Sequence, residues 1–293
     1  MKIEKLLKRY RVEDGKQFRL KDYDPADTHG LKSELKPQAR QWLAHGVEKL
    51  SSLQDILAAQ DRWGLLLVLQ AMDAAGKDGT IKHVMSGVNP QGVEVASFKA
   101  PSPEELDHDY LWRSMKHVPQ RGRIGIFNRS YYEEVLVVRV HQELLEKQKL
   151  PKSLVTRHVW QERFEDINAF ERYLARNGIA VLKIFLHVSK KEQKRRFTER
   201  LDRPDKNWKF SSADLKERQC WDAYQEAYED MIRHTAKQHA PWYVVPADNK
   251  WFTRLVVAAA VAHALEGLNL KYPKLTGEQK ADLEKARQQL QQE

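Results

Sequence analysis

Short apolar runs alternate with longer amphipathic stretches over most of the chain. Residues 65–70 (LLLVLQ) form a continuous apolar run that ends at a glycine-containing turn, as is typical of a buried parallel strand. Four more apolar runs follow, each separated from the next by a segment with helical character. This alternation predicts a three-layer α/β fold, in which a parallel five-stranded sheet carries helices on both faces. The predicted strands cover residues 65–70, 93–98, 123–127, 180–188 and 242–247.

Helix signals define the segments between these strands. The first helix is expected to end near Val88, before an Asn-Pro pair, and Ser102 followed by proline and two glutamates is typical of a helix N-terminus. No linker or internal repeat interrupts the pattern, so residues 1–293 are interpreted as one domain. Residues 1–40 are predicted to form an arm that packs on the body, and residues 274–293 a polar tail. The remaining predicted helical segments are about 131–148, 152–177, 189–236 (a charged hairpin) and 249–269.

The charge of the chain is positive and unevenly distributed. Fifty lysines and arginines against 41 aspartates and glutamates give a net charge of +9. This balance favours an anionic partner: nucleic acid, an acidic membrane or a phosphorylated small molecule. Residues 190–209 carry nine basic and four acidic side chains, and residues 1–23 carry eight and four. The rest of the chain is close to neutral, which favours a channel for one particular polyanion over a uniformly basic surface.

Several classes of protein are disfavoured by the sequence. The single cysteine, Cys220, cannot form an internal disulfide, and no Cys/His cluster has the spacing of a structural zinc site. The longest apolar stretch, 255–265, falls short of the roughly 20 residues that a membrane span needs, and the charged N-terminus lacks the apolar run of a secretory signal. We therefore expect a soluble, cytoplasmic protein with no membrane partner and no structural metal.

The turn after the first strand has features of a phosphate-binding loop. It reads AMDAAGKDGT (71–80). Gly76 would let the backbone approach an anion at the start of a helix, and Lys77 would add a mobile positive charge. The match is incomplete, because Ala71 replaces the usual first glycine and Asp78 replaces the serine or threonine that usually binds magnesium. The alternative is an ordinary surface turn, but its place between a buried strand and a helix favours phosphate binding.

Polar residues at two strand ends indicate a metal site. Asp73 would repel a phosphate unless a metal ion lay between them, so we expect it to bind Mg²⁺ or to accept a hydrogen bond from a nucleotide; a turn-stabilising role is the alternative. After the third strand, Asn128 stands where an acid often holds magnesium, and Glu133 and Glu134 follow close by. Arg129 is suited to bridging phosphate oxygens, although Asn128 as a helix cap and Arg129 in a surface ion pair remain the alternative.

The charged hairpin follows the fourth strand, where nucleotide-kinase-like folds carry a mobile lid. Arg196, Arg200 and Arg203 recur at i, i+4 and i+7 and would share one helix face. A solvated helix face is the alternative. A nucleic-acid-binding role predicts aromatic residues interleaved with the basic ones, but residues 190–209 hold only Phe197 and a tryptophan. Nucleic acid is therefore not an expected partner.

Five stretches together resemble the polyphosphate kinase 2 family over about residues 60–272. The resemblance implies a P-loop kinase-like fold with a helical lid at about 189–236. It also implies transfer of a phosphoryl group between inorganic polyphosphate and a nucleotide, with Mg²⁺ (or Mn²⁺) as cofactor, in a homodimer or homotetramer. The stretches are LQAMDAAGKDGTIKHV, GVNPQGVEVASFKAPSPEELDHDYLWR, FNRSYYEEVLVVRV, EQKRRFTERLDRPDKNWKFSSADL and APWYVVPADNKW.

The motif after the third strand resembles that of one class within the family. Members that act mainly on nucleoside diphosphates tend to carry D-R-S-W-Y-N-R, whereas Asn128 and Glu133 here fit N-R-S-x-Y-E-[DE]. The second pattern resembles class III, which implies that AMP is converted to ADP and ADP to ATP. The sequence leaves open the choice between adenine and guanine nucleotides. The alternative is an ATP-dependent nucleoside or nucleoside-monophosphate kinase, which the missing hydroxyl after Lys77 and the strongly basic lid disfavour.

The resemblance also implies the roles of individual residues. The expected catalytic residues are Asp73, Lys77 and Arg129. The expected phosphate- and polyphosphate-binding residues are Ala75, Gly76, Lys77, Asp78, Gly79, Thr80, Lys82, Arg129, Arg196, Arg200 and Lys209. The expected nucleotide-binding residues are Asp73, Arg113, Asn128, Arg129 and Glu133. The expected metal ligands are Asp73, Asn128 and Glu133.

Overall fold

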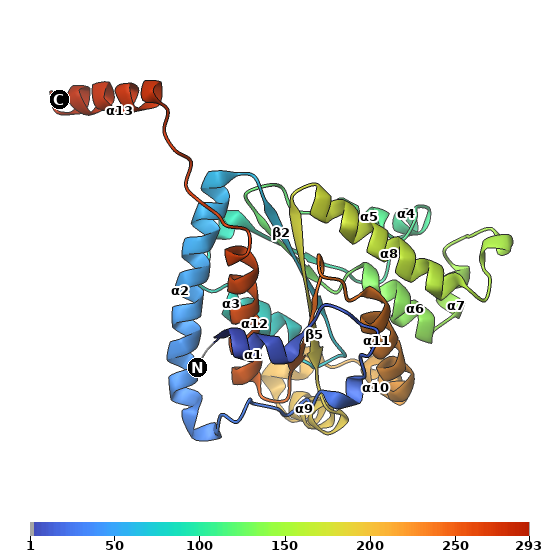
Figure 1. Ribbon diagram of the computed structural model, residues 1–293. Helices are drawn as coiled ribbons and strands as arrows, with labels where there is room; N and C mark the ends of the chain where they lie inside the picture. The colour runs from blue at the N-terminus through green and yellow to red at the C-terminus, as the bar shows by residue number, and fades with distance from the viewer. Residues whose placement is uncertain (1–2, 293) are drawn as a thin grey trace.

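A six-stranded sheet forms the centre of the computed structural model, which describes residues 3–292 (Figure 1). Its strand order is β1-β6-β5-β2-β4-β3, and the five strands predicted from the sequence are all parallel. The predicted sheet was one strand short, because the two-residue β1 adds antiparallel to β6 and is too short to leave a pattern. The strands are β1 (Arg11–Val12), β2 (Gly64–Gln70), β3 (Val93–Ser97), β4 (Ile124–Asn128), β5 (Ile179–His187) and β6 (Trp242–Pro246).

Strand β2 lies in the middle of the sheet, between β4 and β5. All seven of its residues are buried, which explains why the sequence shows an unbroken apolar run there and no alternation. The parallel arrangement brings the carboxyl ends of β2, β3 and β4 to one edge of the sheet. Ligands of open parallel sheets bind at this edge.

One face of the sheet is covered by α2 (Lys36–Gln60), α3 (Lys77–Val84) and α12 (Lys250–Glu266) (Figure 1). Helix α12 packs against α2, α3, β5 and β6, so its long apolar run is a buried core helix. The N-terminal arm packs on the same layer through α1 (Ile3–Tyr10), whose Leu6, Leu7 and Tyr10 are buried. The arm ends before α2, five residues earlier than predicted.

The other face is covered by α8 (Val159–Arg176), α11 (Trp221–Thr235) and short helical segments. The single helix predicted at 131–148 is wrong, because this stretch consists of a 3₁₀ segment η4 (Tyr131–Val135), α6 (Val137–Val140) and α7 (Glu143–Glu146). Leu136 and His141 have non-helical backbone angles that separate the three pieces. The helix predicted from residue 152 begins as α8 only at Val159, after a 3₁₀ turn.

A fully buried ion pair connects this layer to the sheet. Lys183 of β5 lies 2.6 Å from Glu171 of α8, and both side chains have no exposed surface. The hydroxyls of Tyr131 and Tyr132 donate hydrogen bonds to Glu171, at 2.9 and 2.7 Å. These contacts hold the two tyrosines of η4 in the core. Neighbouring side chains of a regular helix point in different directions, so a regular helix could not turn both tyrosines inward, and the helix is broken here.

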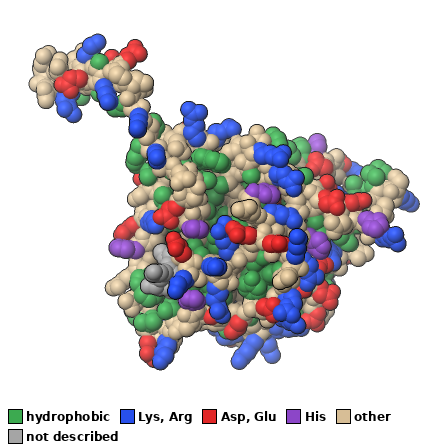
Figure 2. All heavy atoms as spheres, in the orientation of Figure 1, with side chains coloured by type: hydrophobic (Ala, Val, Ile, Leu, Met, Phe, Trp, Pro, Cys, Tyr) green, Lys and Arg blue, Asp and Glu red, His purple; other side chains and the backbone are tan. Residues whose placement is uncertain are grey.

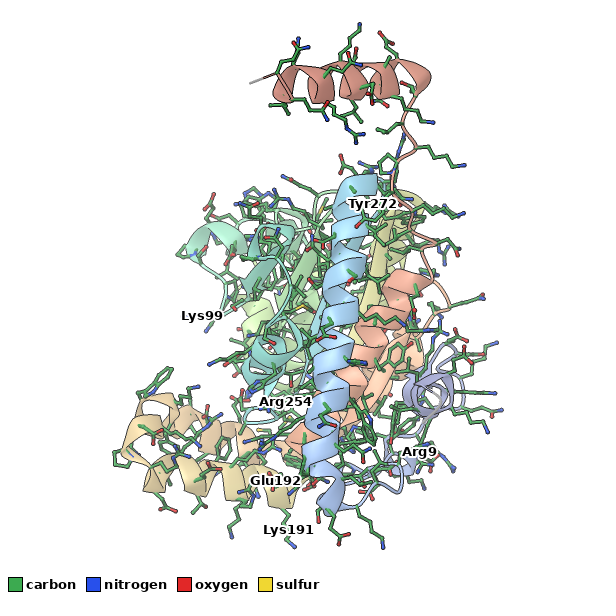
Figure 3. The ribbon with its side chains drawn as sticks, turned by 90° about the vertical axis from the view of Figure 1, so that its left-hand side faces the viewer. Arg9, Lys99, Lys191, Glu192, Arg254 and Tyr272 are labelled. Carbon is green, nitrogen blue, oxygen red and sulfur yellow. The ribbon has the colours of Figure 1, made fainter. Side chains whose placement is uncertain are left out.

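Two helical pieces extend from the body. Helix α9 (Lys190–Asp202), η6 (Pro204–Lys209) and α10 (Ser212–Gln219) form a projecting hairpin, residues 190–219, at the lower left of Figure 3. Helix α11 belongs to the body, where Tyr228, Met231 and Ile232 join the core. Helix α13 (Gly277–Leu290) stands away from the body beyond an extended segment, and every residue of it is exposed (Figure 1).

The remaining elements are short. They are η1 (Leu20–Asp22), η2 (Ser33–Leu35), η3 (Pro90–Gly92), α4 (Pro103–Leu106), α5 (Trp112–Met115) and η5 (Lys152–Leu154).

In residues 3–292 no helix is both long and apolar enough to span a membrane. On the face drawn in Figure 2, basic and acidic side chains are interspersed and do not form one broad basic surface.

Candidate active site

The loop between β2 and α3 has the backbone conformation of an anion-binding turn. Ala74 has a φ of +60° and Gly76 a φ of +108°, and α3 begins immediately afterwards at Lys77. Only glycine adopts the Gly76 conformation without strain. Left-handed residues alternating with ordinary ones bring successive backbone N–H groups into a concave arrangement that binds anions. The helix N-terminus at the same place adds the partial positive charge of its free N–H groups.

Lys77 is the first residue of α3 and belongs to the segment 71–80, which is called the P-loop below. Its Nζ donates a hydrogen bond to the carbonyl oxygen of Ala71, at 2.9 Å. Burial, with a smaller contribution from the nearby Arg129, lowers the pKa of Lys77 to about 8, although Asp73, Glu133 and Asp78 act in the opposite direction. A buried ammonium group with a lowered pKa is stabilised when an anion such as phosphate comes next to it.

Arg129 connects the P-loop to the end of β4. Its Nη2 lies 2.6 Å from Asp73 Oδ1, and its Nη1 lies 3.0 Å from Glu133 Oε2. The two carboxylates raise the pKa of Arg129, so its charge is fixed. Arg129 has a φ of +64°, which is rare for a residue with a side chain and is retained where the surroundings require it. The structure thus brings together Asp73, Lys77, Arg129 and Glu133, as the sequence predicted.

A second contact joins the same two segments. Asn128 Nδ2 donates a hydrogen bond to Asp78 Oδ1, at 2.7 Å. Asp78 occupies the position after the P-loop lysine, where a hydroxyl is usual, and Asn128 occupies the strand end, where an acid is usual. The two departures from the usual pattern are therefore neighbours in space. Each explains the other, since an acid at both positions would place two carboxylates in contact.

A cavity of about 510 Å³ opens beside the P-loop and contains nine basic side chains and three acidic ones. Four of the basic residues were missed in the sequence. Lys99 follows β3, Lys206 lies in η6, and Lys250 and Arg254 lie one turn apart at the start of α12. The sequence feature that could have revealed Lys250 and Arg254 is their i, i+4 spacing directly after the last strand. Figure 3 shows Lys99 and Arg254 on the side from which the projecting hairpin extends.

Not all predicted residues face this cavity. Lys82 lies exposed on α3 and does not line it. Arg113 donates a hydrogen bond to the carbonyl oxygen of Lys99 and packs over the ring of Phe98, so it supports the cavity wall from behind. The predicted P-loop residues line the cavity together with the predicted residues of the hairpin. These are Ala75, Gly76, Lys77, Asp78, Gly79 and Thr80 from the loop and Arg196, Arg200 and Lys209 from the hairpin.

The predicted metal ligands do not form a ready-made cage. Among residues 3–292 no group of three or more His, Cys, Asp or Glu side chains is arranged to hold a metal ion. Both carboxylate oxygens of Glu133 accept hydrogen bonds, one from Gln70 and one from Arg129. Asp73 and Asn128 line the cavity, and both carry side-chain oxygen atoms, the donors that Mg²⁺ prefers. Mg²⁺ is usually held by one or two carboxylates together with substrate phosphates and water, so this donor set fits it.

A loop with an anion-binding conformation after the central strand, facing a cavity lined by cations, is typical of a phosphotransferase. A model of the family "Polyphosphate kinase 2 (PPK2)" matches residues 34–273, and the chain belongs to this family. It is therefore an enzyme, a polyphosphate:nucleotide phosphotransferase. The resemblance expected from the sequence is confirmed.

Relatives and solved structures match nearly the whole chain. An ADP-polyphosphate phosphotransferase of Rhodopseudomonas palustris is 47% identical over 282 residues, 94% of this chain and 98% of that protein. An AMP/ADP-polyphosphate phosphotransferase of Meiothermus ruber is 49% identical over 267 residues, 91% of this chain and 96% of that protein. The crystal structure of polyphosphate kinase 2 from Arthrobacter aurescens superposes with a TM-score of 0.87 at 39% identity, covering 98% of this chain and 97% of that one.

Proposed function

We propose that this enzyme uses inorganic polyphosphate to convert AMP to ADP and ADP to ATP. The observation that carries the proposal is the cavity, in which nine cations surround a P-loop. A single triphosphate needs fewer cations, whereas a chain of phosphates can contact many of them. The relative from Meiothermus ruber is named for both AMP and ADP, and the Asn128 and Glu133 pattern supports the same pair of acceptors.

The chemistry we propose is direct in-line transfer. An anionic oxygen of the acceptor's terminal phosphate attacks the terminal phosphorus of polyphosphate, and the bond to the next bridging oxygen breaks. That oxygen leaves with the electron pair, on a chain one phosphate shorter. Lys77 and Arg129 would contact the transferred group and neutralise its charge, and Asp73 would orient Arg129. The attacking oxygen is already ionised at neutral pH, so the reaction needs neither a strong general base nor a covalent enzyme intermediate.

We assign the path of polyphosphate to the cations beyond the P-loop. Burial lowers the pKa of both Lys250 and Arg254, which means that their charges are poorly compensated in the ligand-free protein. A polyanion would supply that compensation. Arg200 and Lys209 would cover the chain from the projecting hairpin, which would act as the lid. Arg200 is held 3.3 Å from Asp214, a contact that polyphosphate would compete for.

For the cofactor we propose Mg²⁺, with Mn²⁺ as a substitute, held by Asp73 and Asn128 and by substrate oxygens. When bound, the ion would neutralise phosphate charge and align the reacting groups. The proposed substrates are intracellular metabolites, so we expect the enzyme to work in the cytoplasm. We also propose that it assembles as a homodimer or homotetramer.

The direct test is to incubate the purified protein with Mg²⁺, long-chain polyphosphate and AMP, and to follow ADP and ATP over time. Successive formation of both supports the proposal. If ADP but not AMP is phosphorylated, the acceptor assignment is wrong. If polyphosphate gives no product while ATP phosphorylates AMP, the protein is an ATP-dependent kinase. The Lys77→Ala variant is the control for contaminating activity.

A further inference from the structure

Helix α9 of the projecting hairpin binds three consecutive carbonyl oxygens of the P-loop. Gln193 Nε2 donates to the carbonyl oxygen of Asp73, at 3.0 Å. Arg196 Nη1 donates to those of Ala74 and Ala75, at 2.9 and 2.7 Å. Both side chains are deeply buried, with 1% and 4% of their surface exposed.

The other donors of Arg196 are also engaged. Its Nη2 donates to the carbonyl oxygens of Ala247 and Asp248, at 2.5 and 3.1 Å, and its Nε donates to Glu192 Oε1, at 2.7 Å. A guanidinium group has five N–H donors, so these contacts account for all of them. An arginine that is buried and fully hydrogen-bonded to protein has no donor left for a phosphate chain.

These contacts fix the direction of the P-loop peptide groups. In a trans peptide the C=O and the following N–H point in opposite directions. Holding the carbonyl oxygens of residues 73–75 toward α9 therefore turns the N–H groups of residues 74–76 away from it. Of these three groups, Ala75 N–H donates to the carbonyl oxygen of Met72, at 3.3 Å, so anion binding falls to the N–H groups of Ala74 and Gly76. The left-handed conformations of Ala74 and Gly76 are those of a backbone nest that binds anions through such N–H groups.

We propose that Gln193 and Arg196 are positioning residues that hold the P-loop in its anion-binding conformation, and that Arg196 is not a polyphosphate ligand. This deepens the proposed function and rests on it. The same contacts tie the first two turns of α9 to the loop after β6, where Ser189 N also donates to Asp248 Oδ1, at 2.8 Å. The moving part of the lid therefore begins after Arg196, and the hairpin closes from there onward.

Replacing Gln193 gives the sharpest test, because Gln193 is neutral and its replacement removes no charge. In Gln193→Leu the second partner of Gln193, Arg218, keeps its hydrogen bond to the carbonyl oxygen of Lys190. We expect kcat to fall by at least about tenfold, since small misplacements of reacting groups have effects of this order. Tripolyphosphate, measured by calorimetry, should bind at least about tenfold more weakly. Gln161→Leu, the same change at an exposed glutamine of α8, is the matched control and should match the wild type.

Salt dependence separates positioning from direct binding. The slope of log Kd for tripolyphosphate against log salt concentration reports the number of cations that contact the polyanion. Arg196→Gln should lower kcat and keep the wild-type slope, because Arg196 does not contact the polyanion, whereas Arg200→Gln should lower the slope. Thermal unfolding of each variant shows whether the fold is retained, and Arg196→Gln serves if Gln193→Leu does not fold.

Two results would overturn the proposal. One is a folded Gln193→Leu enzyme with wild-type kcat and tripolyphosphate affinity. The other is a folded Arg196→Gln enzyme with a reduced salt slope and an unchanged kcat at saturating polyphosphate, which would make Arg196 a ligand. Because tripolyphosphate binding is measured without turnover, an error in the proposed acceptors leaves this test intact.

Discussion

The side chain of Gln70 donates a hydrogen bond to Glu133, with Nε2 and Oε1 2.8 Å apart. Gln70 is the last residue of the central strand and is completely buried, and its Oε1 accepts a hydrogen bond from Ser130. Glu133 in turn holds Arg129. A buried amide at the end of β2 thus connects the strand to the arginine that faces the phosphates.

Replacing Gln70 with leucine should therefore disturb both activity and stability. Gln70→Leu removes the donor to Glu133 Oε1 and the acceptor of the Ser130 hydroxyl, which costs about 1–3 kcal/mol of unfolding free energy for each polar group left unsatisfied. We expect kcat to fall about tenfold, because Arg129 loses its fixed orientation. Urea denaturation and initial rates measure the two effects. Gln161→Leu, an exposed glutamine on α8, should change neither; a Gln70→Leu enzyme with unchanged kcat would contradict the connection.

Lys77→Ala should reduce turnover by about 10³-fold or more, since it removes a charge that acts on the transferred phosphoryl group. Steady-state rates at saturating polyphosphate and ADP provide the measurement. Lys82→Ala, on the exposed side of the same helix, is the control. A Lys77→Ala enzyme that kept more than about a tenth of the wild-type rate would remove Lys77 from the mechanism.

The pKa of Lys77 predicts a pH limit. In the free enzyme this pKa is lowered to about 8, so the ammonium group is charged below pH 8 and loses its proton as the pH rises through that value. We expect kcat/KM for polyphosphate to fall above about pH 8, because kcat/KM reports the ionisation of the free enzyme. At saturating polyphosphate kcat should stay constant to higher pH, since the bound anion raises the pKa. A flat kcat/KM profile up to pH 10 would contradict this.

The pair Asn128 and Glu133 is expected to decide the acceptor. Asn128→Asp combined with Glu133→Asn recreates the pattern associated with diphosphate acceptors, and it removes the hydrogen bond that Asn128 now donates to Asp78. We expect AMP phosphorylation to fall much more than ADP phosphorylation, and the Mg²⁺ requirement to change. Competing AMP and ADP in one assay gives the ratio directly. An unchanged ratio would show that acceptor choice lies elsewhere.

Salt should weaken the binding of polyphosphate more than the binding of nucleotide. Many cations contact the chain, so its KM should rise more steeply with ionic strength than the KM of ADP. The variants Lys250→Gln and Arg254→Gln should each raise the KM of polyphosphate and flatten its salt dependence. Equal salt dependence of the two substrates would place the polyphosphate path away from this cavity.

The buried pair of Lys183 and Glu171 should be costly to break. Lys183→Met leaves an uncompensated carboxylate in the core and should destabilise the fold by about 3–5 kcal/mol. The double variant Lys183→Met/Glu171→Leu should lose less than the sum of the single losses. Urea denaturation of the three variants tests this, and additive losses would contradict it.

The sequence predicted the fold wherever one local pattern determined the structure. Four of the five parallel strands are buried along almost their whole length, β3 at the sheet edge being the exception, and apolar runs mark all five to within one residue at every end. The helix predicted for residues 131–148 was wrong because the structure of this stretch depends on Glu171 and Lys183, which are distant in sequence. The helical interpretation considered only local periodicity, and tertiary contacts overrode it.

The residues of the candidate site also fall into two groups, those that a local sequence pattern reveals and those that it does not. Gly76 and Lys77 are recognisable from a local motif, and Arg129 from its place after a strand. Arg196 was correctly placed in the hairpin, but the sequence could not show that its guanidinium binds backbone carbonyls of the P-loop. Lys250 and Arg254 were missed because their importance comes from the sheet, which brings the start of α12 next to a loop about 175 residues earlier in the chain.

The short strand β1 has a consequence for the handling of this protein. It pairs with Trp242 and Tyr243 at the outer edge of β6, whose sequence WYVVP is apolar and buried throughout. An uncovered edge of this kind pairs readily with other chains. Shortening the N-terminus past Val12 would therefore favour aggregation even if the active site stayed intact, and tags are best added at the exposed C-terminal helix instead.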